Sequence, residues 1–81
     1  MLFRSPFSNS TEIKFYLPVH SNAKLEIFNV LGELMEVLVS DELDKGTYTV
    51  NFGGINYISG VYFYRLTTDT YTATKTMNII R

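Results

Sequence analysis

Apolar and polar residues alternate with a period of two along most of this 81-residue chain. In residues 11–17 the pattern places Ile13, Phe15 and Leu17 on one face and Glu12, Lys14 and Tyr16 on the other. A period of two is typical of β-strands with one buried face, whereas an amphipathic helix repeats about every 3.6 residues. The alternation therefore predicts an all-β fold.

Turn residues divide this pattern into six predicted strands: 11–17, 23–30, 33–39, 47–52, 60–67 and 71–80. A seventh strand is added if Leu2–Phe7 pairs at a sheet edge. Short strands at this spacing favour an antiparallel β-sandwich of the immunoglobulin-like type. Gly32 is expected to take a positive φ in a turn, and the last two strands are expected to form a hairpin over Thr68-Asp69.

The alternation also predicts which side chains form the core. Besides the first strand, the inward residues are Ala23, Leu25 and Ile27, and then Tyr48, Val50 and Phe52. Residues 33–39 are more continuously apolar, so this strand is expected to be covered on both faces. A polar loop is predicted for Ser40–Lys45.

Composition excludes several classes of function. Seven Lys or Arg against eight Asp or Glu give a net charge of −1, without the basic excess of a nucleic-acid binder. The absence of cysteine excludes disulfides, thiolate metal sites and a cysteine nucleophile. Ser and Thr occur without a Gly-x-Ser-x-Gly motif. We therefore expect no enzymatic activity, no cofactor and no metal site.

Several polar and aromatic residues are individual candidates for a functional role. His20 has no acidic neighbour in sequence and is expected to be a lone surface residue. Asp41, Glu42 and Asp44 lack the spacing of a calcium loop and predict a solvated turn. A carbohydrate-binding platform would need exposed aromatic residues, for which the candidates are Tyr16, Phe28 and Tyr57.

A series of motifs resembles the type A C-terminal sorting domain of the type IX secretion system of Bacteroidetes. This family overlaps in pattern with the immunoglobulin-like domain of flagellar hook-capping proteins. The matching blocks are Ser5–Thr11, Ile13–Phe15, Leu17-Pro18, Phe28–Gly32, Val37–Val39, Gly46–Val50, Ser59–Leu66 and Thr74–Arg81. Three departures stand out: the opening Asn and second Pro of the family pattern are lost, Thr76 replaces the second Lys of a basic pair, and Arg81 replaces a terminal Lys.

The resemblance implies a non-catalytic signal domain over residues 5–81, with residues 1–4 as a linker or an expression remnant. Such a domain follows a cargo protein, passes through the periplasm, and directs the cargo through an outer-membrane translocon to the cell surface or outside. A cell-surface sortase commonly removes it. The alternative is a generic immunoglobulin-like accessory module, such as a hook-capping relative, a spacer or an adhesion unit.

Recognition is expected to involve the closing hairpin, because a terminal strand with exposed backbone groups can pair with a partner's sheet edge. The candidate recognition residues are Gly60, Val61, Tyr62, Lys75, Met77, Ile79 and Arg81. Val61–Leu66 fits a core strand as well as a contact surface, and Lys75 and Arg81 fit solvated ends as well as recognition charges. Exposed edge strands also lead us to expect self-association of the isolated domain.

Overall fold

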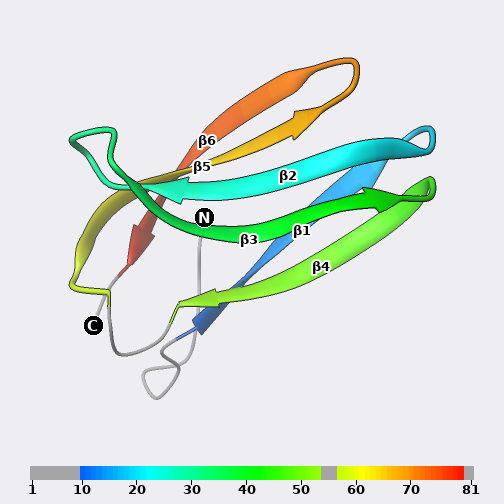
Figure 1. Cartoon of the computed structure of the whole chain (residues 1–81). Helices are drawn as coiled ribbons and strands as arrows, with labels where there is room; N and C mark the ends of the chain where they lie inside the picture. Colours follow the sequence, from blue (N-terminus) through cyan, green and yellow to red (C-terminus); the bar gives the residue numbers. More distant parts are fainter. Residues whose placement is uncertain (1–9, 54–56, 80–81) are drawn as a thin grey trace.

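Two antiparallel sheets make up the part of the chain that the computed structural model describes, residues 10–53 and 57–79 (Figure 1). The strands are β1 (Ser10–Leu17), β2 (Ser21–Phe28), β3 (Leu34–Leu43), β4 (Gly46–Gly53), β5 (Gly60–Thr68) and β6 (Thr72–Ile79). These ranges contain no helix, and hence none that could cross a membrane. The predicted all-β fold is confirmed, whereas the predicted edge strand Leu2–Phe7 lies outside the described residues.

The smaller sheet has the order β1-β4 and the larger has the order β3-β2-β5-β6, an arrangement consistent with a β-sandwich. The chain passes between the sheets at the β1–β2 and β3–β4 turns. These two turns and the β5–β6 turn lie at one end of the molecule, and the β2–β3 turn lies at the other (Figure 1). Thr67 is opposite Thr72 across the last turn, which confirms the predicted closing hairpin.

The core lies between the sheets and consists largely of the predicted inward side chains. Its buried residues are Ile13, Phe15, Leu17, Ala23, Leu25, Ile27, Phe52, Tyr57, Tyr62, Leu66, Met77 and Ile79, with Tyr48 and Val50 packed against them. The ring of Tyr57 lies edge-on to Phe52 and Tyr62, with centroid distances of 4.7 and 5.4 Å. Such edge-to-face contacts add to the free energy gained from burying apolar area.

The prediction for the third strand was wrong in two respects. Leu34, Met35 and Val37 are 52%, 45% and 45% exposed, so the strand is not covered on both faces. Among the described strands, β3 is an edge strand of the larger sheet that pairs with β2 alone, and the smaller sheet has two strands. In addition, β3 continues to Leu43, through the predicted loop, because Ser40–Leu43 pair with Ser21–Lys24.

Candidate recognition surface

The predicted recognition residues lie on two neighbouring strands that close the described chain. Gly60 begins β5 opposite Ile79 of β6, and Tyr62 is opposite Met77. The antiparallel register thus brings together residues that are 15 to 19 positions apart in sequence. Arg81 lies outside the described residues.

Strand alternation divides these residues between the two faces of the hairpin. Tyr62, Met77 and Ile79 are each 5% exposed and form part of the core. The Tyr62 hydroxyl donates a hydrogen bond to the Ile58 carbonyl at 2.8 Å, which satisfies its polar group at the rim of the core. Val61 is 42% exposed on the outer face. The hairpin is therefore both a core element and a surface.

Lys75 lies on the same face of β6 as the buried Met77 and Ile79, yet it is exposed. Two-residue periodicity places residues 75, 77 and 79 on one side of the strand. Met77 and Ile79 belong to the core between the sheets, whereas the part of that side around Lys75 is open. β6 is also the last strand of its sheet, and no other described strand pairs with its outer edge.

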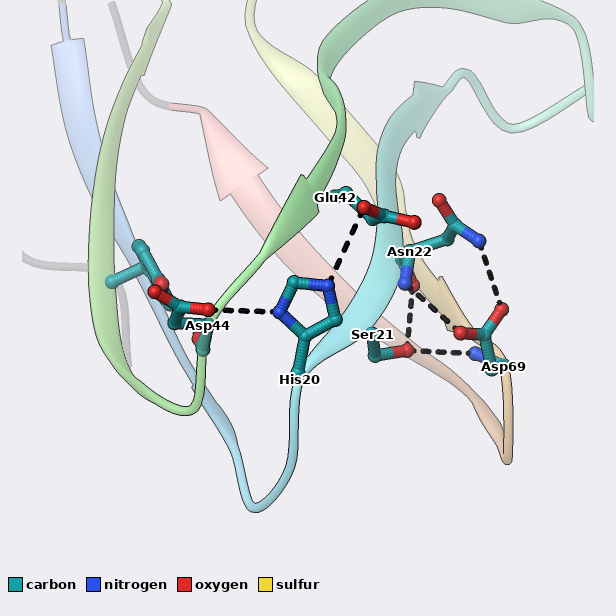
Figure 2. Close-up of polar contacts among 7 residues, drawn as sticks. His20, Ser21, Asn22, Glu42, Asp44 and Asp69 are labelled. Atoms are coloured by element: carbon teal, nitrogen blue, oxygen red, sulfur yellow. Dashed lines mark hydrogen bonds and ion pairs between the residues drawn. The ribbon is translucent and has the colours of Figure 1, made fainter.

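A polar cluster joins the β1–β2, β3–β4 and β5–β6 turns at their shared end of the molecule (Figure 2). His20 Nδ1 lies 2.8 Å from Asp44 Oδ1, and His20 Nε2 lies 3.4 Å from Glu42 Oε1. The hydrogen bond with Asp44, followed by that with Glu42, raises the pKa of His20 above its ordinary value of 6.5. The expectation that His20 lacks an acidic partner was therefore wrong, although the residue is exposed.

Asp69 connects the β5–β6 turn to the beginning of β2 in the same cluster. Its carboxylate accepts hydrogen bonds from the Asn22 backbone N–H at 3.1 Å and from the Asn22 side-chain amide at 3.2 Å. The Asp69 backbone N–H donates to Ser21 Oγ at 3.0 Å. The bond from the Asn22 backbone is the main cause that lowers the pKa of Asp69.

No sequence pattern predicts this cluster, because its partners lie 22 to 48 positions apart in sequence. The acidic residues meet His20 only because the β3–β4 turn lies beside the β1–β2 turn (Figure 2). Within the described ranges, no group of three or more His, Cys, Asp or Glu is placed to hold a metal ion. The contacts are those of a structural link between turns.

The three candidate aromatic residues for a carbohydrate platform do not share a surface. Tyr57 is 7% exposed, and its hydroxyl donates a hydrogen bond to Glu36 Oε1 at 2.8 Å. Burial, followed by this bond, raises the pKa of Tyr57. Tyr16 is exposed on β1 of the smaller sheet, whereas Phe28 belongs to β2 and lies under the Arg65 guanidinium at 4.4 Å. Tyr57 is therefore too buried to belong to such a platform.

Comparison with known proteins agrees with the motifs that lie along these strands. The sequence model of the family described as "Secretion system C-terminal sorting domain" matches residues 2–80. No curated protein and no solved structure gives a significant match. The match covers nearly the whole chain, including both strands of the closing hairpin. The chain therefore belongs to the family of type IX secretion C-terminal sorting domains.

Proposed function

We propose that this domain is a non-catalytic export signal that directs a protein attached upstream of it through the type IX translocon. The observation that carries the proposal is the family match over residues 2–80. Membership implies export to the cell surface or outside, and sorting-signal domains are in general non-catalytic. The domain passes through the periplasm as a folded unit and then meets a cell-surface sortase, which commonly removes it.

Recognition of a folded signal requires groups that stay accessible after folding. Of the predicted residues on the closing hairpin, Gly60, Val61 and Lys75 are accessible, as is the outer backbone edge of β6. Tyr62, Met77 and Ile79 act indirectly, because their burial holds both strands in register. We assign Arg81 a contribution of positive charge to the partner contact.

The test is a reporter protein fused ahead of the complete domain in a bacterium that has a type IX system. We expect the reporter at the surface or in the medium, and in the periplasm when the translocon is deleted. Deleting residues 77–81 would be a poor test, because it removes the buried Met77 and Ile79 and so unfolds the domain. Retention of the complete fusion in the periplasm of the competent strain would refute the proposal.

Charge reversal at Lys75 tests whether the exposed surface of the closing hairpin contributes to recognition. Lys75→Glu should lower export several-fold because it alters an exposed charge on β6. Lys24→Glu is the matched control, because Lys24 is also exposed on a strand but lies on β2. Both variants should have the thermal stability of the wild type. Equal export of the two variants would show that Lys75 is not part of the recognition surface.

A further inference from the structure

The smaller sheet leaves one edge of β1 unpaired among the described strands. Among the described strands, β1 pairs only with β4. The hydroxyl of Tyr71, the residue directly before β6, donates a hydrogen bond to the Tyr16 carbonyl at 3.2 Å. The Tyr16 carbonyl therefore points away from β4. Because successive residues of a strand direct their backbone groups to alternate sides, Glu12 and Lys14 present their N–H and C=O to the same open edge.

A groove of about 250 Å³ runs beside this edge, between β1 and β6. Its apolar lining comes from Ile13, Phe15, Leu25, Tyr64, Leu66 and Ala73. The hollow continues along Lys75 toward Met77 and Asn78. It exists because the two-stranded sheet is too narrow to cover the inner face of β6, so Ala73 and Lys75 remain exposed. One further strand beside β1 would cover it.

The charges along the groove favour an acidic occupant. Lys14 and Lys75 both line its main part, and no carboxylate lies among the described lining residues there. Glu12 lines only the continuation toward Asn78. An opposite charge directly across from a strand residue stabilises the pairing, and a like charge destabilises it. A segment with a carboxylate opposite Lys14 therefore fits, and one with a lysine there does not.

We propose that an extended segment of a partner protein, with alternate apolar side chains and an acidic residue opposite Lys14, adds to β1 as a third strand. Backbone hydrogen bonds supply the pairing, and the apolar side chains cover Tyr64 and Ala73. The inference rests on the proposed function, which requires a partner protein that recognises the folded domain.

The probe is the capped peptide acetyl-Val-Thr-Val-Asp-Val-Thr-Val-amide, titrated into the isotope-labelled chain of 81 residues and followed by amide NMR shifts. We expect saturable shifts on β1 and β6, and binding about tenfold weaker when the Asp of the peptide is replaced by Lys. Absence of saturable shifts, shifts confined to β3 or β4, or equal affinity for both peptides would overturn the proposal.

Two proline variants provide a matched pair. Lys14→Pro removes an N–H that faces the open edge and leaves the β1–β4 ladder intact, so it should weaken peptide binding at least about tenfold. Thr49 is directly opposite Lys14, so Thr49→Pro removes the equivalent N–H from the outer edge of β4 and should bind the peptide normally. Lys14→Glu tests the charge without altering the backbone, if the proline variant does not fold. Normal binding by a folded Lys14→Pro variant would refute strand addition.

Other occupants of the open edge of β1 would give different results in the NMR titration. Concentration-dependent shifts on β1 without peptide would identify a second copy, and binding only after removal of residues 1–9 would identify the chain's own N-terminus. Either result would overturn the proposal. Peptide binding needs no secretion machinery, so it can succeed while the reporter fusion fails. Conversely, normal export of a folded Lys14→Pro fusion would overturn this inference and leave the proposed function intact.

Discussion

Asn29 shows how one residue can fix a turn at the scale of single side chains. Its Oδ1 accepts hydrogen bonds from the backbone N–H of Leu31 at 2.9 Å and of Glu33 at 3.0 Å. Its side-chain amide donates to Glu33 Oε1 at 2.7 Å. Gly32, with φ of 82°, takes the left-handed conformation that the sequence predicted for it. The Asn-x-x-Gly spacing of the motif is thus a requirement of the β2–β3 turn.

Asn29→Ala should lower the free energy of unfolding by about 1 to 2 kcal/mol, because it leaves the turn N–H groups without their acceptor. Val30→Ala is the control, since Val30 is 63% exposed in the same turn and its truncation should change stability by less than about 0.5 kcal/mol. Urea denaturation measures both. Equal effects of the two substitutions would show that the side-chain bonds of Asn29 do not stabilise the turn.

At the scale of elements, β6 combines buried and exposed positions in one short strand. Met77 and Ile79 are buried. Asn78 between them and Thr76 before them are exposed. Since side chains alternate in direction along a strand, a shift of one residue would exchange the two sets. Pairing with β5 along the whole of β6 prevents that shift. The strand that we propose as part of the signal is therefore positioned by the core.

Met77→Ala should destabilise the domain by about 2 to 4 kcal/mol, because it removes buried apolar volume. Thr76→Ala, one position away on the exposed face, should cost less than about 0.5 kcal/mol. Thermal denaturation followed by circular dichroism compares the two. If both substitutions lower the melting temperature equally, the assignment of faces along β6 is wrong.

At the scale of the whole molecule, the polar cluster joins turns that belong to different strand pairs. His20 links the β1–β2 turn to the β3–β4 turn, and Asp69 links the β5–β6 turn to the beginning of β2. The chain passes between the two sheets at the first two of these turns. The cluster therefore holds these three turns together at one end of the molecule.

The raised pKa of His20 makes this link dependent on pH. A pKa higher in the folded state means that the stabilisation is fully present below the unfolded value of about 6.5 and is lost as pH rises through the folded pKa. The free energy of unfolding of the wild type should therefore fall as the pH rises from about 6.5 through the folded pKa, and that of His20→Gln should not. Urea denaturation at a series of pH values measures the difference. If the free energies of unfolding of the wild type and His20→Gln differ by the same amount at every pH, the link formed by His20 does not depend on pH.

The sequence by itself determined the strands, most of the inward faces and the family. Alternation along the chain is a local property, so the burial of Ile13, Leu25 and Met77 follows once one face is covered. Asn29 and Gly32 act within their own turn, and their motif could be read directly.

Only the tertiary structure decided the features that depend on which strands are neighbours. The apolar run of β3 is exposed because the strand lies at a sheet edge, and no sequence pattern gives its place in the sheet. His20 meets Asp44, and Tyr57 meets Glu36, across more than 20 positions of sequence. The groove beside β1 likewise results from the unequal widths of the two sheets. Periodicity specifies the faces of a strand, whereas contacts between distant segments are set by how the sheets pack.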